Sequence, residues 1–344
     1  MPSVSAPASR TIELPSEGEM EAQLRRWTGE AAPWPVGYRE WCKVVKVPAR
    51  GRGMVAWKPE RWHGVLDGAI KAQKDVFCLK EKGIRWTTDH ILRCLWLGML
   101  TENATGIYLT VNEDEAFKNP DSFKERMRLV YYQLPEWLRW LSPLVECPEG
   151  SFGTMGDLVW DHSRWAQLGE SRSWLMVRPA TQNAGAAGRY TDCVLDEMER
   201  YEDPDATLSG VMAGTHETGG HVIAGSTLTV NSSMSSRLWQ EYVLGQVEPA
   251  TIGGPVADQP QAGLFFGWGS LDGQTEEAYA VMEAKAKLRG AQGLLELHRL
   301  YPRTPEEAMS AFGKGLATPE ALRECHEERP NLPVPEGLRK WELV

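Results

Sequence analysis

The sequence lacks the features that would place the protein in a membrane, in an oxidising compartment or along a nucleic acid by charge alone. Its longest apolar run, residues 91–100, is too short to cross a bilayer and contains Arg93. Six scattered cysteines form no C-x-x-C pair, so we expect reduced thiols in a cytosolic protein and no metal cluster. The polar, Pro/Ser-rich N-terminus is not expected to be a signal peptide. A net charge of −10 argues against nonspecific coating of nucleic acid but permits a local basic channel.

What the chain does contain is an alternation of apolar strands and amphipathic helices. Its 344 residues, 15 of them Trp, suffice for one large α/β domain or two smaller ones. The alternation begins near residue 55 and predicts a doubly wound α/β sheet. Strands are expected at residues 75–79, 106–111, 158–160, 174–177, 193–197, 222–230 and 264–268, and helices at residues 58–73, 86–100, 121–140, 204–212, 235–244, 275–288 and 291–300. Ahead of them we expect disorder at residues 1–20, a short helix at 21–27 and an irregular lead-in at 33–53.

The stretch Cys193–Glu197 is an apolar run that ends in two adjacent carboxylates. A buried strand of a parallel sheet has this composition, and its tip opens at the carboxyl edge, where ligands bind. At such an edge Asp196 can hold Mg²⁺, and Glu197 can orient and deprotonate the water that attacks a γ-phosphate. Many buried strands end in Asp-Glu, so these five residues alone fit a purely structural strand equally well.

A basic loop at residues 79–87 lies between an expected strand and an expected helix. Phosphate binds at such places because backbone N–H groups and the helix N-terminus point at it, and Lys80 and Lys82 add charge. The loop is not G-x-x-x-x-G-K-[ST], because Ile84 stands where that motif has Lys and Arg85 where it has the Ser or Thr that meets Mg²⁺. Taken alone, the loop is more typical of a generic basic turn.

The order of the motifs favours phosphate binding. The basic loop comes first, the acidic strand tip follows about 110 residues later, and a strand ending in Ser226 and Thr227 comes next. Additional-strand ATPases have this order, with a third motif that senses the γ-phosphate and couples hydrolysis to motion. The three segments together therefore predict a nucleotide site that none of them predicts by itself.

Residues 301–309 read Tyr-Pro-Arg-Thr-Pro-Glu-Glu-Ala-Met. This run is close to Y-P-x-T-P-E-E-A-F, a signature of the large terminase subunits of tailed bacteriophages, the ATPases that pump DNA into procapsids, and the chain resembles that family. Supporting matches are Lys80–Thr87 against roughly K-x-R-x-x-G-[IF]-[ST]-W, Val194–Glu197, the Ser226-Thr227 pair, Leu134–Leu138 against L-P-x-W-L, and the strand ending in Gly267-Trp268. The resemblance covers about residues 55–344.

The resemblance implies a P-loop NTPase of the additional-strand (ASCE) type, an α/β fold with a mostly parallel central sheet and helices on both faces. It divides the chain into an N-terminal lead-in at residues 1–54, an ATPase domain at residues 55–330 and a linker at residues 331–344 toward an RNase H-like nuclease domain. Because the chain stops at Val344, we expect no metal-dependent DNA cleavage from it.

The resemblance also implies roles for individual residues. Asp196 and Glu197 match the Walker B pair, for Mg²⁺ coordination and water activation, and Ser226 and Thr227 match the coupling motif. Arg85 departs from the family's Ser or Thr, and Thr87 or Thr88 is the candidate to replace it. The implied ATP-binding residues are Lys80, Glu81, Lys82, Gly83, Ile84, Arg85, Trp86 and Thr87, with Arg61 and Trp62 on the adenine side. Core packing is the better explanation of Trp62.

Family members carry an arginine upstream of the Walker B pair that can act in trans on the ATP of a neighbouring subunit. Arg189 is the candidate here, displaced by about two positions from the family spacing. Arg178 and Arg172 are alternatives, and a surface salt bridge explains Arg189 equally well.

The function implied by the resemblance is ATP hydrolysis, with ATP and Mg²⁺ as cofactors, coupled to translocation of double-stranded DNA into a procapsid. Implied partners are DNA contacted through its backbone phosphates, a portal protein, a small terminase subunit and further copies of the chain in a pentameric ring. Such a protein acts in the host cytoplasm, docked transiently on the procapsid, and away from any membrane. Two alternatives stay open: another nucleic-acid-dependent P-loop ATPase such as a helicase-like motor, and a degenerate, non-hydrolysing nucleotide-binding module, which Ile84 and Arg85 favour.

Overall fold

The computed structural model describes residues 15–28, 36–49, 52–72, 75–145, 157–164, 171–181, 184, 188–227 and 261–310. Within these residues a hairpin pairs β1 (Lys46–Ala49) with β2 (Gly53–Ala56). The main sheet has eight strands in the order β10-β3-β9-β8-β4-β7-β6-β5. They are β3 (Asp75–Lys80), β4 (Thr105–Thr110), β5 (Leu144–Val145), β6 (Asp157–Asp161), β7 (Arg172–Pro179), β8 (Asp192–Asp196), β9 (His221–Ser226) and β10 (Gln261–Phe266).

The strand order confirms the predicted α/β class with a mostly parallel sheet. All pairings from β10 to β7 are parallel. At the other edge of the described sheet β6 pairs antiparallel with both β7 and β5, so β6 alone among these strands runs in the opposite direction. Strand β9 lies between β3 and β8, which is the additional-strand arrangement. Because parallel strands share a carboxyl edge, the ends of β3, β8 and β9 meet at one place.

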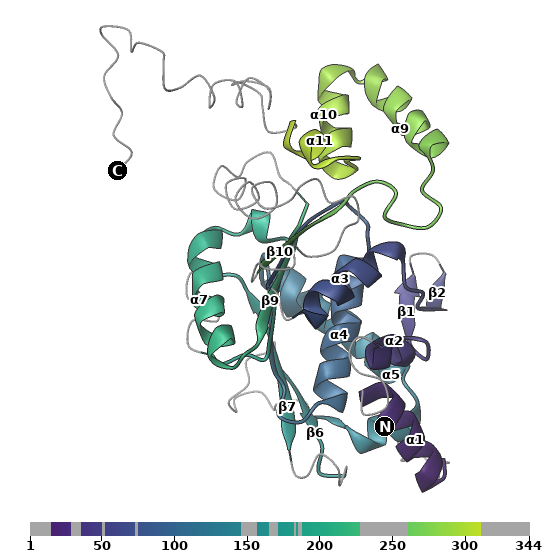
Figure 1. The fold of residues 1–344 in the computed structure, drawn as a ribbon, viewed down its shortest axis with the longest axis vertical. Helices are drawn as coiled ribbons and strands as arrows, with labels where there is room; N and C mark the ends of the chain where they lie inside the picture. The colour runs from purple at the N-terminus through teal and green to yellow at the C-terminus, as the bar shows by residue number, and fades with distance from the viewer. Residues whose placement is uncertain are drawn as a thin grey trace, which may run out of the picture.

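Helices cover both faces of the sheet (Figure 1). The helices and short turns are α1 (Glu17–Thr28), α2 (Val36–Cys42), α3 (Arg61–Lys71), α4 (Trp86–Leu100), η1 (Asp114–Lys118), α5 (Phe123–Tyr132), α6 (Glu136–Leu141), η2 (Met198–Arg200), α7 (Pro204–Glu217), α9 (Glu276–Leu288), α10 (Gly290–Leu300) and α11 (Pro305–Ser310). Helix α7 lies on one face, and α3 and α4 lie on the other (Figure 1).

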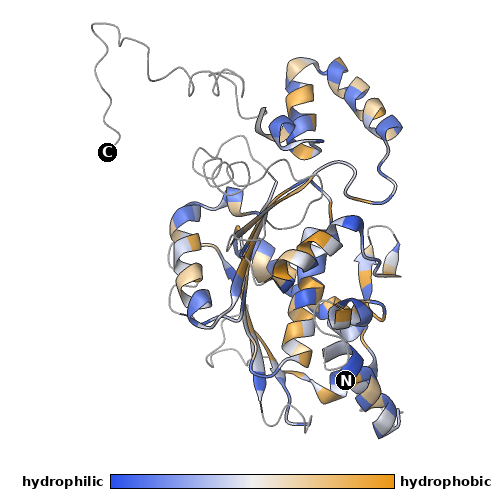
Figure 2. Ribbon diagram, in the orientation of Figure 1, coloured by the Kyte–Doolittle hydropathy of each residue, from blue (hydrophilic) through white to orange (hydrophobic). Residues whose placement is uncertain are grey.

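Side-chain alternation along β3 explains the two layers. Val76 and Cys78 join the core cluster on the side of α3 and α4, whereas Phe77 and Leu79 join the cluster on the side of α7. Figure 2 shows that apolar residues gather in the sheet and in α4, at the centre of the molecule. The four described cysteines, Cys42, Cys78, Cys94 and Cys193, are buried free thiols.

The prediction of an irregular lead-in at residues 33–53 is wrong. Tyr38, Trp41 and Cys42 are spaced three and four residues apart, so they lie on one face of α2 and are buried in the core. Residues 46–49 pair with residues 53–56 in the β1–β2 hairpin, in which Gly53 supplies a left-handed backbone angle of φ 69°. The described Pro and Gly of this stretch lie within elements, Gly37 in α2, Pro48 in β1 and Gly53 at the start of β2, so they do not indicate irregular structure here.

The expected single helix at residues 121–140 is two helices. Helix α5 ends at Tyr132 and α6 begins at Glu136, because Pro135, which cannot continue a helix, adopts an extended ψ of 135° as the N-cap of α6. The predicted apolar stripe is confirmed as core packing, since Met127 and Leu138 are buried on either side of the break.

The other expected elements agree with the structure to within a few residues where they are described. Helices α1 and α7 are longer than expected, and the expected helix at residues 58–73 begins at Arg61. The expected helix at residues 235–244 and the last part of the expected strand at residues 222–230 lie outside the described residues.

Helices α9, α10 and α11 form a small unit beyond the carboxyl edge of the sheet (Figure 1). Its own buried cluster consists of Tyr279, Ala286 and Leu297. Two backbone hydrogen bonds attach it to that edge: Lys82 N donates to Leu300 O at 2.8 Å, and Trp268 N donates to Pro302 O at 2.7 Å. Among the described helices, none is long and apolar enough to cross a bilayer.

Candidate nucleotide-binding site

The loop between β3 and α4 has a backbone suited to bind an anion. Gly83 and Arg85 both have left-handed backbone angles, φ 90° and 67°, and turn the chain into the first turn of α4. Glu81 N donates a hydrogen bond to Phe266 O at 2.8 Å, and Lys82 N donates one to Leu300 O. No described residue accepts a hydrogen bond from the N–H of Gly83, Ile84 or Arg85. Together with the free N–H groups of the α4 N-terminus, they form a cluster of donors for phosphate oxygens.

The loop meets the acidic tip of β8. Lys80 Nζ lies 2.6 Å from Glu197 Oε1, and Thr87 Oγ1 donates to Asp196 Oδ2 at 2.7 Å. These residues are more than a hundred positions apart in the sequence and are brought together because β3, β9 and β8 are neighbours in the sheet. The predicted convergence of the loop and the Asp-Glu pair is therefore present in the structure.

Lys80 is the cation of the site. It is only 5% exposed, and its ammonium group is paired with Glu197. Burial alone would lower its pKa, but the nearby carboxylates of Glu197 and Asp196 outweigh burial and raise the pKa above its ordinary value. Lys80 therefore carries its charge at neutral pH. By contrast, the next lysine, Lys82, has an exposed side chain.

Asp196 has one oxygen held in place and one without a hydrogen-bond partner. Its Oδ2 accepts hydrogen bonds from Thr87 Oγ1 at 2.7 Å and from Tyr108 OH at 2.6 Å. Its Oδ1 is buried and has no hydrogen-bond partner among the described residues. An oriented carboxylate with one unused oxygen suits a hard divalent cation, and Mg²⁺ typically takes one or two carboxylates plus phosphate oxygens and water. Burial raises the pKa of Asp196, and a bound cation would favour its ionised form.

Glu197 is held in an unusual conformation by β9. Its backbone is left-handed, φ 55°, and its N–H donates to Gly225 O at 2.8 Å. Glu197 Oε2 lies 3.4 Å from both Ser226 Oγ and Thr227 N. The predicted coupling residues are thus in contact with the predicted catalytic carboxylate. A non-glycine residue with positive φ is strained, and such strain is typical of a functional site.

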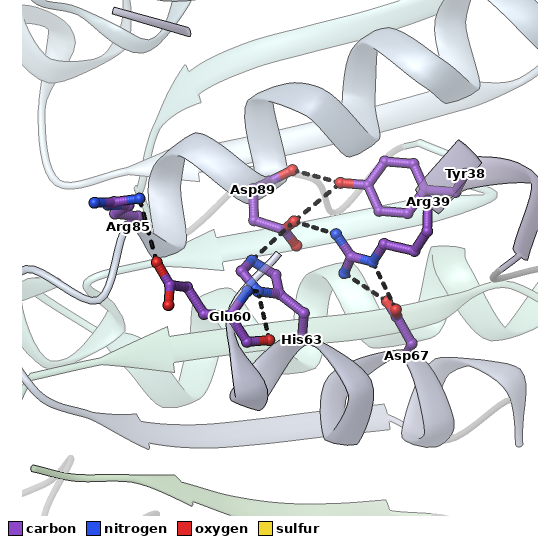
Figure 3. A network of polar contacts seen from close by, with 7 residues as sticks. All are labelled: Tyr38, Arg39, Glu60, His63, Asp67, Arg85 and Asp89. Atoms are coloured by element: carbon purple, nitrogen blue, oxygen red, sulfur yellow. Dashed lines mark hydrogen bonds and ion pairs between the residues drawn. The ribbon is translucent and has the colours of Figure 1, made fainter. Parts of the chain in front are cut away.

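The outer part of the loop is held by Glu60, which precedes α3. Glu60 Oε1 lies 3.3 Å from Arg85 Nη1 (Figure 3). Glu60 Oε2 accepts a hydrogen bond from Asp272 N at 3.0 Å. The Arg85 side chain is 54% exposed and pairs with Glu60, whereas the hydroxyl that contacts Asp196 comes from Thr87. Arg61 is exposed and lies 3.4 Å from Asp272.

Three of the implied ATP-binding residues have side chains in the core. Trp62 is 1% exposed and packs its ring against His63 and Trp86, so its faces are already covered. Ile84 and Trp86 are also buried. Trp86 lies directly against Gly225, where a β-carbon would come within 2.4 Å of the indole. These side chains set the shape of the loop, which leaves only the backbone of Ile84 and Trp86 to contact a ligand.

Arg189 does not join the site. It precedes β8, whereas Asp196 and Glu197 end that strand. Its side chain is 79% exposed and lies 3.2 Å from Glu217 at the end of α7. The alternative Arg178 lies near the carboxyl end of β7 and pairs with Asp157 at 2.5 Å. Arg189 therefore cannot serve its own site, and its exposure leaves it accessible to another subunit.

A buried polar network fixes the first turn of α4 (Figure 3). Asp89 Oδ1 lies 2.8 Å from Arg39 Nη1, 3.1 Å from Tyr38 OH and 3.3 Å from His63 Nε2. Burial would raise the pKa of Asp89, but Arg39 and His63 outweigh burial and hold it well below its usual range. Arg39 also pairs with Asp67 in α3. The network joins α2 and α3 to the turn that carries Thr87.

Comparison with solved structures places this arrangement in a known fold. The ATPase domain of the large terminase from Thermus phage P74-26, in a variant form, has a similar structure with a TM-score of 0.51 and 12% identity, covering 71% of this chain and 93% of that one. The chain has the fold of a large terminase ATPase domain. The large terminase of bacteriophage HK97 gives a TM-score of 0.50 at 10% identity, covering 85% of this chain but 51% of that chain. This chain thus matches about half the length of the HK97 protein. Neither protein-family profiles nor curated proteins give a match by sequence.

The sequence motifs did not identify two residues that contact this candidate nucleotide-binding site. Tyr108 lies in the expected second strand, and its hydroxyl binds Asp196, but nothing in an apolar strand pattern marks one tyrosine as polar in function. Gln274 binds Glu81 from the segment after β10. No sequence pattern distinguishes one glutamine in a polar turn, so only the folded structure could identify Gln274.

Proposed function

We propose that the protein is an ATP-hydrolysing motor subunit that translocates double-stranded DNA, the ATPase part of a large terminase. The observation that carries this proposal is the convergence of Lys80 and Thr87 with Glu197 and Asp196 at one edge of a terminase-like fold. The hydroxyl of Thr87 weakens the case for a degenerate module, because it fills the role that Arg85 leaves open.

Each residue has a distinct task in the proposed reaction. The N–H groups after Lys82 and the Lys80 ammonium bind phosphate oxygens. Asp196 would hold Mg²⁺ through its unused oxygen, and the cation would neutralise charge on the phosphates. Glu197 accepts a proton from the attacking water, and its ion pair with Lys80 fixes the position of its carboxylate. Ser226 and Thr227 contact that same carboxylate, so a change at the γ-phosphate can reach β9.

The wider motor assembly is part of the proposal. Copies of the chain would form a ring, a pentamer by family analogy, docked on a portal protein in the host cytoplasm and loaded with DNA by a small terminase subunit. DNA would be held through its backbone phosphates, because a translocating motor must accept any sequence. Arg189 would reach the ATP of a neighbouring subunit, where a trans arginine is worth about 10³-fold or more in rate.

The test is ATP turnover by wild type and Glu197→Gln at high protein concentration, with and without double-stranded DNA. We expect Glu197→Gln to lose turnover by a factor of about 10² or more while still binding ATP, because only the base is removed. Equal rates in the two proteins would overturn the proposal. Stimulation by double-stranded DNA and no strand separation distinguish a packaging motor from a helicase-like ATPase.

A further inference from the structure

Glu81, the residue after Lys80, has a carboxyl group with no role in the reaction described so far. It is 0% exposed, and its Oε1 accepts a hydrogen bond from Gln274 Nε2 at 2.6 Å. Its Oε2 is buried and has no hydrogen-bond partner among the described residues. Burial raises the pKa of Glu81 to about 7, while the bond from Gln274 opposes that rise. An acid is thus kept inside the phosphate-binding loop at a cost in stability, with one described hydrogen bond to hold it.

The amide of Gln274 can present only its nitrogen to Glu81. Its Oε1 accepts hydrogen bonds from Gly269 N at 2.8 Å and from Leu271 N at 3.0 Å. Two backbone donors therefore fix the amide orientation, and Nε2 must face the carboxyl group. The bond between Gln274 and Glu81 has a defined direction, with a donor on the turn and an acceptor on the loop.

The same part of the chain also holds the loop backbone. Glu81 N donates to Phe266 O, at the end of β10, and Lys82 N donates to Leu300 O, at the end of α10. The side-chain bond from Gln274 is a third attachment, from the turn between β10 and α9. All three are made just before the loop N–H groups that have no acceptor among the described residues, so they determine where those groups point.

We propose that Glu81 and Gln274 are positioning residues of the nucleotide site. Their hydrogen bond sets the phosphate-binding loop so that the N–H groups of residues 83–85 converge on the ligand phosphates. The turn between β10 and α9 thereby becomes part of the nucleotide site, although it contributes no group to the ligand. This inference rests on the proposed function, because it assumes that the loop binds a nucleotide triphosphate.

Reversing the direction of the hydrogen bond tests the proposal. In Gln274→Glu, an oxygen still accepts from the two backbone donors, but a second oxygen faces Glu81 where a donor is needed. The assay is run at about pH 9, because Glu81 has a pKa of about 7 and a protonated Glu81 would itself donate a hydrogen bond to the new carboxylate. Adding Glu81→Gln to that variant restores a donor–acceptor pair with the opposite direction. We expect Gln274→Glu to weaken binding of a fluorescent ATP analogue about tenfold, and the double variant to return within about threefold of wild type. In turnover, KM should rise with kcat nearly unchanged, because binding in the ground state and transition state is lost equally.

Glu276→Gln is the matched control, since Glu276 is exposed on the first turn of α9, two residues from Gln274. It should bind the analogue as wild type does. Gln274→Met serves as a second variant, which removes the donor without adding charge, and thermal melting of each variant separates loss of binding from loss of fold. Wild-type affinity in Gln274→Glu, or a double variant no better than Gln274→Glu, would overturn the inference. A wild type that binds no nucleotide would instead overturn the proposed function.

Discussion

At the scale of single residues, we propose that Thr87 compensates for the departure from the usual phosphate-loop motif. The chain enters α4 through Arg85, whose left-handed backbone and bond to Glu60 direct its side chain toward solvent. Thr87 lies two residues further on, in the first turn of α4, and its hydroxyl reaches Asp196 at 2.7 Å. One hydroxyl and the Tyr108 phenol thus orient the carboxylate that we assign to Mg²⁺.

Removing that hydroxyl should slow hydrolysis. In Thr87→Val the Asp196 carboxylate keeps only its bond from Tyr108, so its free oxygen is less well placed for the cation. We expect kcat to fall by about ten- to a hundredfold, as for loss of a hydrogen bond to a charged group. Phosphate release at saturating ATP measures the change, and Thr87→Ser, which keeps the hydroxyl, should stay within about threefold of wild type. A fast Thr87→Val enzyme would show that Thr87 has no part in orienting Asp196.

The buried Glu81 predicts a pH dependence of stability. Its pKa is about 7 in the folded protein against an ordinary 4.5, so the folded state binds more protons than the unfolded state between these values. The stability contribution of Glu81 is therefore present at low pH and is lost as pH rises through about 7. Glu81→Gln cannot ionise, so its free energy of unfolding relative to wild type should increase by roughly 2 to 3 kcal/mol from pH 5 to pH 8.

Denaturant unfolding of the unliganded protein at the two pH values measures this difference. Glu276→Gln, on the exposed surface of α9, should show the same pH dependence as wild type. If the difference between Glu81→Gln and wild type were the same at pH 5 and pH 8, Glu81 would not titrate in this range.

At the scale of elements, two helical glycines should respond in opposite ways to the same change. A β-carbon on Gly214, in α7, would lie 1.9 Å from Gly188 O, so the close approach of α7 to the segment before β8 requires glycine. Gly68, in α3, is exposed, with nothing within 4 Å of an added β-carbon. We expect Gly214→Ala to lose about 1–3 kcal/mol and Gly68→Ala to gain about 0.5–1 kcal/mol, since alanine lowers the entropy of the unfolded chain.

Thermal or denaturant unfolding of the two variants side by side provides the measurement. Because the chemical change is identical, any difference between them reports the environment of each glycine. A stable Gly214→Ala would mean that the segment around Gly188 can move away from α7 without cost.

The elements themselves were largely predictable, for a physical reason. A strand buried on both faces, such as β3 or β8, is a short apolar run, and α4 is a longer one, so length and periodicity separate them. The errors arose where a few particular residues outweigh a pattern. Pro135 divides an otherwise continuous apolar stripe between α5 and α6. In the Pro- and Gly-rich stretch, burial of three side chains in the core stabilises α2. A stripe shows which residues are buried but not whether one helix carries them.

At the scale of the whole molecule, the site depends on strand order, which the sequence alone supports only through the order of its motifs. Lys80 meets Glu197 because β9 separates β3 from β8 by a single strand. The meeting of these two segments was predictable from the order of the motifs along the chain. The contacts of Tyr108 and Gln274 were not, because they depend on how individual side chains fill the space between elements. The placement of Arg189 away from its own site likewise emerged only in the folded structure.

The position of Arg189 leads to a prediction about assembly. Because it lies at the opposite end of β8 from Glu197 and is exposed, it can contribute to hydrolysis only at a site on another subunit. A Glu197→Gln subunit would then have an inactive site of its own but could still supply Arg189 to a neighbour. An Arg189→Ala subunit would have an intact site but could not supply the arginine. Each variant alone should turn over ATP at least about 10²-fold more slowly than wild type, and mixing them should restore part of the activity.

Phosphate release as a function of mixing ratio, at concentrations where wild-type turnover per subunit has stopped rising, measures this rescue. Arg178→Ala is the comparison variant, since Arg178 already pairs with Asp157 in its own subunit. Mixtures no more active than the average of the separate variants would exclude Arg189 as the residue supplied in trans, and rescue by Arg178→Ala instead would transfer that role to Arg178.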